Sequence, residues 1–301
     1  MLILISDAFD ASLEGKLKAF GEVTTDKARA CDADIILVRA KTTCDKAYID
    51  GLKNCKLIIR GGVGIDNIDK AYAESKGIIV KNTPKASGIA VAELAFSLML
   101  SVPNHINFYH NGMMSNQWLK STKRTELFGK TLAFIGMGNI AYQVAKRAVA
   151  FGMNVVAYDV YVDEKKKDIV KFVSTPEEAV ADADYISLHV PGMDSTKGMV
   201  NKDLIAKMKK HPVLINTCRG AVINPEDVKA ALDNGSLSWY ATDVYPTDDA
   251  EKLFAMDYPL FKSDKVTFTP HVGANSVENL LRIGEEVCTT IQALKDEGKL
   301  N

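Results

Sequence analysis

The chain has 301 residues, of which 47% are hydrophobic and 25% are charged, and its formal net charge is −1. These proportions are typical of a globular protein with about two domains. A net charge near zero without a basic tail argues against nucleic acid or an acidic membrane surface as a partner.

Strand and helix signals alternate through the first third of the chain. Strands are predicted at 2–6, 35–38, 57–59 and 78–80, and a helix at 11–20. This order predicts a parallel sheet. Gly61-Gly-Val-Gly64 directly follows one of these strands, at the position where open α/β sheets place ligand-binding loops.

A second series of strands and helices begins at Thr131, after a long apolar helix predicted at 91–100. Between them lies a polar stretch that contains Pro103 and has no clear strand. We therefore expect a domain boundary near residue 100, with the apolar helix as the connector.

Gly136 and Gly138 stand between a predicted strand at 132–135 and a predicted helix at 140–149. This is the order of a dinucleotide-binding turn, although its third position is Ala141. Gly136 allows the sharp turn, and Gly138 allows the backbone to approach a pyrophosphate. The N–H groups that open the helix, at Asn139 and Ile140, then face the phosphates.

Asp159 follows the next predicted strand, at 155–158, where the acidic ribose ligand of such a turn belongs. A carboxylate at this position accepts hydrogen bonds from ribose hydroxyls and repels a 2′-phosphate. The predicted cofactor is therefore NAD rather than NADP.

Further strands are predicted at 185–190, 213–216, 239–244 and 266–269, and a strong amphipathic helix at 277–294. The predicted fold is α/β, with two Rossmann-like, doubly wound parallel-sheet domains. If the last helix returns to the first domain, that domain is discontinuous. The expected organisation is then 1–99 with 275–301 as a substrate domain and 100–274 as a cofactor domain.

Three of these later strands end in side chains that are common in active sites. Arg219 follows one strand, Asp248 and Asp249 follow another, and His271 follows a third. The ends of parallel strands line the crevice of a doubly wound sheet. An arginine, a carboxylate and a histidine there supply an anchor, an orienting group and a proton carrier.

The order and spacing of these motifs resemble the D-isomer-specific 2-hydroxyacid dehydrogenases over nearly the whole chain. The motifs are 38–42, 60–67, 82–84, 91–94, the turn at Gly136, 189–191, 216–220 and 269–274. Within that family the chain most resembles the D-3-phosphoglycerate dehydrogenases in a short form, and we expect no regulatory domain after residue 301.

The resemblance implies three catalytic residues. Arg219 binds the carboxylate and 2-oxo group of the substrate, and His271 takes and returns the hydroxyl proton. Asp248 stands where the family has glutamate, one methylene longer, and Asp249 is an alternative partner for the histidine. Further cofactor contacts are implied for Val190, Pro191, Thr217, Asp243, Gly273 and Ala274.

The loop Gly62-Val63-Gly64 offers backbone N–H groups to a small carboxylate. Arg39, Lys41 and Arg60 lie at neighbouring strand ends, and basic residues at the matching positions of phosphoglycerate enzymes suggest phosphate recognition. Alternatively, Arg39 and Lys41 are solvated charges and Arg60 forms an ion pair at a domain interface.

The leading functional hypothesis is NAD-dependent oxidation of D-3-phosphoglycerate in serine synthesis. A reductase of glyoxylate, hydroxypyruvate or another 2-oxo acid is the alternative enzyme, and an NAD-sensing corepressor is an alternative of a different class. Formate dehydrogenase is disfavoured because that relative has glutamine at the position of Asp248.

Five cysteines, with neither zinc nor redox spacing, indicate reduced thiols and a cytoplasmic location. No metal site and no membrane span are expected, and the resemblance implies a homodimer.

Overall fold

The computed structural model describes residues 1–300, which divide into two compact units. Met1–Ala90 joins with the segment from Ala274 onward, and Val91–Gly273 forms the second unit. The division therefore falls inside helix α4 (Gly88–Ser101) rather than near residue 100. The reason is packing, because Ala92, Phe96 and Met99 of α4 are buried in the core of the second unit.

The first unit contains a parallel sheet in the order β2-β1-β3-β4-β5. Its strands are β1 (Leu2–Ile5), β2 (Glu22–Thr24), β3 (Ile35–Val38), β4 (Leu57–Arg60) and β5 (Ile79–Asn82). Its helical segments are α1 (Ser12–Leu17), η1 (Lys27–Asp32), α2 (Lys46–Asp50), α3 (Lys70–Ser75) and α11 (Val277–Asp296). The helix expected at 11–20 is shorter, and the last helix lies in the first unit, which is discontinuous.

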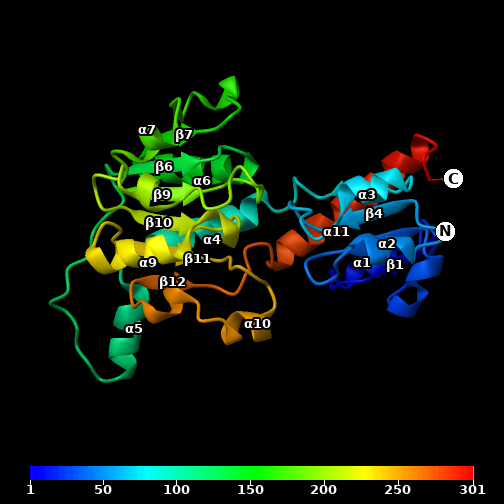
Figure 1. Cartoon of the computed structure of the whole chain (residues 1–301), viewed down its shortest axis with the longest axis horizontal. Coiled ribbons are helices and arrows are strands. Elements are labelled where there is room, and N and C mark those ends of the chain that lie inside the picture. The colour runs from blue at the N-terminus through cyan, green and yellow to red at the C-terminus, as the bar shows by residue number, and fades with distance from the viewer. Residues whose placement is uncertain (301) are drawn as a thin grey trace. The chain divides into compact units, whose positions relative to one another are not determined.

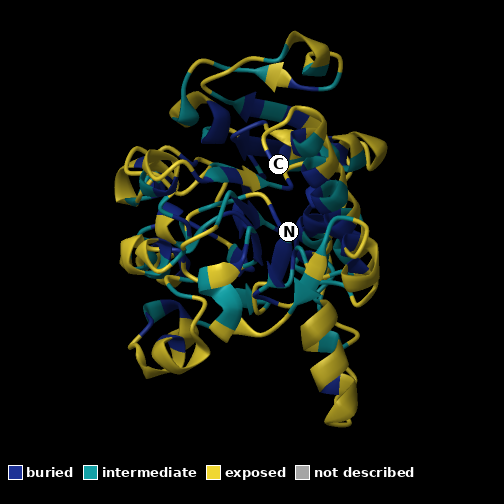
Figure 2. Ribbon diagram, turned by 90° about the vertical axis from the view of Figure 1, so that its right-hand side faces the viewer, coloured by how far each residue is buried: buried dark blue, intermediate teal, exposed yellow. Residues whose placement is uncertain are grey.

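Alternating side chains of each strand enter two different cores. Leu57 and Ile59 of β4 pack with α1 and α11, whereas Ile58 packs with residues of α2 and α3. Successive side chains of a strand point to opposite faces, so continuous apolar runs belong to a sheet covered by helices on both sides. Figure 2 draws the strands as mostly buried and the outer helix faces as exposed.

The second unit contains a parallel sheet in the order β12-β11-β10-β9-β6-β7-β8. Its strands are β6 (Thr131–Ile135), β7 (Asn154–Tyr158), β8 (Lys171–Phe172), β9 (Tyr185–Leu188), β10 (Val213–Asn216), β11 (Trp239–Thr242) and β12 (Val266–Phe268). Its helical segments besides α4 are α5 (Ile106–Met114), α6 (Asn139–Ala150), η2 (Glu164–Lys166), α7 (Pro176–Val180), α8 (Lys202–Ile205), η3 (Gly220–Val222), α9 (Pro225–Asn234), α10 (Ala250–Ala255) and η4 (Pro259–Lys262). Figure 1 shows helices flanking this sheet as well.

Each sheet reverses its strand order beside its first strand. In the first unit the reversal falls between β1 and β3, and in the second unit between β6 and β9. Ligands of open α/β sheets bind outside the strand ends at such switch points. The predicted pair of doubly wound parallel-sheet domains is confirmed.

Helices α4 and α5 occupy the segment after the first unit boundary, where sequence reasoning found one helix and a polar stretch. Among the described residues, no single helix is long and apolar enough to cross a membrane. Only α4 and α5 taken together, bent by 64° at their junction, meet that criterion.

Candidate active site

The turn after β6 requires glycine at residue 136. Gly136 has φ +89°, and a Cβ there would lie 2.4 Å from the carbonyl oxygen of His189. Its N–H donates to the carbonyl oxygen of Tyr158 (2.8 Å). The end of β6 is therefore held between the ends of β7 and β9, at the switch point of the sheet.

Helix α6 begins at this turn and lacks a side-chain cap. Gly138 occupies its N-cap position with no side-chain hydrogen bond, whereas side chains cap α7, α9 and α11. A Cβ at Gly138 would meet no other atom within 4 Å. Space and N–H groups at Asn139 and Ile140 suit a pyrophosphate at the positive end of the helix dipole.

Asp159 lies at the end of β7, and its carboxylate accepts hydrogen bonds from the N–H groups of Met137 and Tyr161. It is thereby fixed against the glycine turn. A carboxylate has about four acceptor positions, so it can also accept from ribose hydroxyls. The residues at this turn therefore fit a dinucleotide without a 2′-phosphate.

Lys166 was missed by sequence analysis because it lies in a short run of exposed lysines. Its side chain is only 17% exposed, and Nζ donates to the carbonyl oxygen of Met137 (2.7 Å). It also lies 3.5 Å from Asp163. Lys166 and Asp159 thus bind the two backbone polar groups of one residue in the glycine turn.

His189 and Val190 line the other side of the switch point. Nε2 of His189 lies 2.8 Å from the hydroxyl of Ser187, and burial lowers the pKa of His189 to about 3. The imidazole is therefore neutral at ordinary pH. Val190 packs against the core, and exposed Pro191 accepts a hydrogen bond from Thr196 through its carbonyl oxygen.

Arg219 follows β10 in a turn that Asn216 organises. Nδ2 of Asn216, which is fully buried, donates to the carbonyl oxygen of Arg219 (2.9 Å), and Oδ1 accepts from the N–H of Cys218 (3.1 Å). Nη1 of Arg219 donates to the carbonyl oxygen of Cys218 (2.6 Å). A Cβ at Gly220 would lie 2.2 Å from the carbonyl oxygen of Tyr245, so only glycine allows this turn to meet the loop after β11.

His271 and Asp248 form a hydrogen-bonded pair. Nδ1 of His271 lies 2.7 Å from Oδ1 of Asp248, and the two side chains are 37% and 46% exposed. His271 has φ +53°, a left-handed conformation that costs energy outside glycine. Since Nδ1 faces the carboxylate, Nε2 remains for a substrate.

Asp249 has a different environment. It caps α10 by accepting from the N–H of Lys252 (3.1 Å) and pairs with its ammonium group (3.3 Å). The hydrogen bond from this N–H is the main reason why the pKa of Asp249 is lowered. Of the two adjacent acids, the structure pairs Asp248 with the histidine.

Asp243, a predicted cofactor residue, anchors the histidine loop. The carboxylate is buried and accepts from the hydroxyl of Thr269 (2.7 Å) and from the N–H groups of Val272 (2.9 Å) and Gly273 (2.8 Å). Thr217, another predicted cofactor residue, has a buried hydroxyl oxygen without a hydrogen-bond partner within residues 1–300. Bound ligands or waters usually satisfy such a group.

The remaining predicted cofactor residue, Ala274, is the first residue of the first unit's second segment. Its carbonyl oxygen accepts from Nδ2 of Asn279 (2.7 Å).

The loop that carries Arg39 and Lys41 is held by Asp7, which sequence analysis missed. The carboxylate of Asp7 accepts from the N–H groups of Arg39 (2.6 Å) and Thr42 (3.1 Å) and from the hydroxyl of Thr42 (2.7 Å). Burial favours the neutral acid, but the hydrogen bonds from Thr42 and Arg39 outweigh it and lower the pKa of Asp7. Asn67 completes the support by donating to the carbonyl oxygens of Arg39 and Thr42.

The glycine loop after β4 is shaped by Arg60. Gly62 has φ +147°, and a Cβ there would lie 1.4 Å from Nη1 of Arg60, so the guanidinium occupies the place of a side chain. The N–H of Thr83 donates to the carbonyl oxygen of Gly62 (3.0 Å), and Nδ2 of Asn82 donates to that of Val63. Gly64 follows, half-buried, and Lys41 is exposed.

Within the described part of the chain, no group of three or more histidine, cysteine, aspartate or glutamate side chains is arranged to hold a metal ion. All five cysteines are free.

Comparison with known proteins identifies the family. The model of the D-isomer specific 2-hydroxyacid dehydrogenase, NAD binding domain, matches residues 96–273. The hydroxypyruvate reductase of Thermotoga maritima is 40% identical over 265 residues, which are 86% of this chain and 84% of that protein. The D-3-phosphoglycerate dehydrogenase of Methanocaldococcus jannaschii is 39% identical over 264 residues, 87% of this chain. The matched part is 49% of that dehydrogenase, so the chain spans about half its length.

A solved structure of D-lactate dehydrogenase from Aquifex aeolicus, in complex with NAD and lactic acid, covers 100% of this chain and 96% of its own, with a TM-score of 0.88 and 27% identity. The family model and these relatives define an NAD-dependent oxidoreductase that acts on CH–OH groups, in agreement with the doubly wound fold and the glycine turn. The chain belongs to the D-isomer specific 2-hydroxyacid dehydrogenase family. The predicted family and the predicted cofactor are confirmed.

Proposed function

We propose that the protein interconverts D-3-phosphoglycerate and 3-phosphohydroxypyruvate with NAD. One observation carries this choice of substrate. Val38 pairs with Arg60 in the sheet register, so Arg39 and Arg60 lie at the ends of adjacent strands, beside the glycine loop. Two cations beside a loop that suits a carboxylate match an acid with a phosphate at its far end.

In the proposed reaction, Arg219 binds the substrate carboxylate. A guanidinium can hold the carboxylate and the 2-oxo group through two hydrogen bonds, which orients C2. The turn at Gly136 and Gly138 would hold NAD, which would supply the hydride acceptor in oxidation and, as NADH, the hydride donor in reduction. The side chains of this chain only bind, orient and move a proton.

His271 is the proposed proton carrier. With Nδ1–H directed at Asp248, Nε2 has a free lone pair and takes the proton of the C2 hydroxyl during oxidation. In the reverse direction the imidazolium gives this proton to the 2-oxo oxygen. Asp248 fixes the ring orientation. Asp243 holds the loop that carries His271 by accepting hydrogen bonds from the N–H groups of Val272 and Gly273.

A reductase of hydroxypyruvate or glyoxylate is the second candidate. The observation in its favour is the 40% identity with the Thermotoga maritima hydroxypyruvate reductase over most of both chains. In that case Arg39 and Lys41 are solvated charges, and Arg60 shapes the glycine loop without reading phosphate.

Steady-state oxidation of NADH against 3-phosphohydroxypyruvate, hydroxypyruvate and glyoxylate separates the candidates. Arg60→Ala should raise KM for the phosphorylated acid at least about ten-fold more than for glyoxylate, because a charge-assisted contact contributes about 1.5–3 kcal/mol. Lys53→Ala, an exposed lysine of the same unit, is the control. Equal effects on both acids would reject phosphate recognition, and tight NADH binding without turnover would favour a sensor.

We also propose a homodimer and a reducing, cytoplasm-like environment. Helix α5 and the residues after it expose Phe108, Met114 and Trp118, which are apolar side chains that a second copy of the chain would cover. The five free thiols support the environment. Light scattering should give twice the chain mass, and Phe108→Glu with Met114→Glu should lower it to one chain. A monomeric wild type would reject the dimer.

A further inference from the structure

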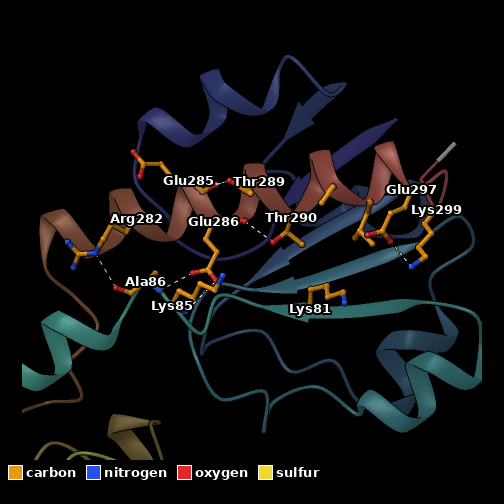
Figure 3. A pocket seen from close by; sticks show the side chains of 12 residues that line it. Lys81, Lys85, Ala86, Arg282, Glu285, Glu286, Thr289, Thr290, Glu297 and Lys299 are labelled. Atoms are coloured by element: carbon orange, nitrogen blue, oxygen red, sulfur yellow. Dashed lines mark hydrogen bonds and ion pairs between the residues drawn. The ribbon is translucent and has the colours of Figure 1, made fainter. Parts of the chain in front are cut away.

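A concavity of about 660 Å³ lies within the first unit, between α11 and the turn that follows β5. Figure 3 shows Glu286 reaching from α11 to the turn at Lys85 and Ala86, with Lys81 on the strand beside it. No residue proposed for catalysis, cofactor binding or substrate binding lines this concavity.

The wall between α11 and the turn is held by hydrogen bonds to the backbone. The carboxylate of Glu286 accepts from the N–H groups of Lys85 (3.3 Å) and Ala86 (2.9 Å). Nε of Arg282 donates to the carbonyl oxygen of Ala86 (3.1 Å). Ala86 is buried, so the helix and the turn form one fixed surface.

The acidic side chains of the concavity already have partners. Glu297 lies 2.6 Å from the ammonium of Lys299, and Glu285 lies 4.0 Å from that of Lys16. Glu286 is engaged with backbone N–H groups, as described above. The hydrogen bond from Lys299, with a smaller effect of Lys81, lowers the pKa of Glu297, so this acid is ionised at neutral pH.

The basic side chains of the concavity differ from the acidic ones in their partners. Within residues 1–300, no carboxylate lies within the 4.0 Å of an ion pair from Lys81, Lys85 or Arg282. Lys85 and Arg282 therefore border the concavity without an ion-pair partner among these residues, and Lys81, which acts on Glu297 from a distance, is a third cation beside them. Charge-assisted hydrogen bonds to an anion are stronger than those between neutral groups.

The residues that line the concavity belong to elements next to both passages between the units. The chain passes between the units at Ala90–Val91 and again at Gly273–Ala274. Lys85 and Ala86 shortly precede the first passage, and α11 begins shortly after the second. Nδ2 of buried Asn279 donates to Ala274 (2.7 Å) and Ser87 (3.3 Å), which joins the two segments inside the first unit.

We propose that this concavity is an effector site for a small organic anion with two or more negative charges, such as a phosphate ester or a dicarboxylate. The anion bridges Lys85 and Arg282, with Lys81 as a third cation, and restrains the segments at both passages. This inference goes beyond the proposed reaction and holds for either candidate substrate.

Calorimetric titration with inorganic pyrophosphate, at ionic strength kept constant with sodium chloride, tests the site. The wild type should bind saturably. Lys85→Ala and Arg282→Gln should each raise Kd about ten-fold or more, as expected for loss of a charge-assisted contact. Lys53→Ala should bind like the wild type. Hydrogen exchange should slow on binding at residues 85–91 and 274–283.

The variants also locate the anion. Arg60→Ala should leave the part of pyrophosphate binding that depends on Lys85 and Arg282 unchanged, because Arg60 does not line the concavity. Loss of binding in Arg60→Ala would overturn the proposal in favour of the substrate loop. Retained binding in both Lys85→Ala and Arg282→Gln would overturn it in favour of an adventitious ion only. Absence of saturable binding would overturn it as well. Calorimetry and hydrogen exchange do not depend on turnover, so their outcomes are independent of the steady-state assays with the three 2-oxo acids.

Discussion

The switch points of the two sheets hold their loops by different means. In the second unit, between β6 and β9, the backbone of Gly136 meets that of His189 so closely that no Cβ fits. In the first unit, between β1 and β3, the carboxylate of Asp7 bridges the gap by accepting hydrogen bonds from Arg39 and Thr42. The switch point of the second unit depends on the absence of a side chain, and we call it the backbone junction. The switch point of the first unit depends on the presence of a side chain, and we call it the side-chain junction.

This difference corresponds to the ligand that each junction is proposed to bind. A dinucleotide presents the same pyrophosphate in every reaction, and backbone N–H groups at a helix start are sufficient for it. A substrate acid varies, so its loops carry side chains whose exchange can change specificity without disturbing the sheet. The comparison predicts that changes in the second unit affect every substrate alike, whereas changes in the first unit affect substrates selectively.

The largest effect is expected for Asp248→Asn. Loss of the carboxylate removes the group that orients His271, and kcat should fall about 10²–10⁴-fold for every 2-oxo acid. Steady-state kcat values for 3-phosphohydroxypyruvate, hydroxypyruvate and glyoxylate measure the loss.

Asp249→Asn is the matched control for this prediction. The asparagine side chain can still accept the hydrogen bond that caps α10, because asparagine and aspartate are comparable N-cap residues, so kcat should stay unchanged. If Asp249→Asn lowers kcat and Asp248→Asn does not, the assignment of the two acids is wrong by one residue.

A comparison of Gly136→Ala with Gly138→Ala tests the backbone junction. The first adds a Cβ 2.4 Å from the carbonyl oxygen of His189 at φ +89°, so it should destabilise the second unit, by about 2 kcal/mol or more. The second adds a Cβ that meets no protein atom, so the melting temperature should stay constant. Gly138→Ala should nevertheless weaken NADH binding, about ten-fold, in a fluorescence titration. Equal melting temperatures for the wild type, Gly136→Ala and Gly138→Ala would contradict this account.

The same contrast explains which features could be predicted from sequence. The turn at Gly136 was predictable because its residues are contiguous and each has a known task. The pairing of Asp248 with His271 was predicted from the family resemblance with Asp249 as the alternative, and the coordinates place Asp248 beside the histidine. Asp7 could not be found, because its partners follow another strand and an acid after a first strand carries no signal of its own. Lys166 was hidden by the exposed lysines on either side.

Asp7→Asn tests the side-chain junction. An amide cannot accept all the hydrogen bonds from Arg39 and Thr42, so KM for the acid should rise about ten-fold, with NADH affinity unchanged. The folded protein holds the pKa of Asp7 below its ordinary value of 3.8, so the ionised form stabilises the fold above that pH. This contribution is lost as pH falls through the lowered pKa. The difference in urea stability between wild type and variant should therefore be larger at pH 7 than at pH 2, and a constant difference would contradict it.

The smallest effect is expected for Lys166→Met, which removes one hydrogen bond to the glycine turn and one positive charge near Asp159. A single hydrogen bond contributes about 0.5–1.5 kcal/mol, so Kd for NADH should rise about three-fold. Kd for NADPH should rise further, since the ammonium offsets part of the repulsion between Asp159 and a 2′-phosphate. Lys167→Met is the control, because that side chain is exposed and pairs with Glu164 instead. Similar changes of Kd in Lys166→Met and Lys167→Met would indicate a general charge effect rather than a contact with the turn. The backbone junction would then hold the turn without a contribution from Lys166.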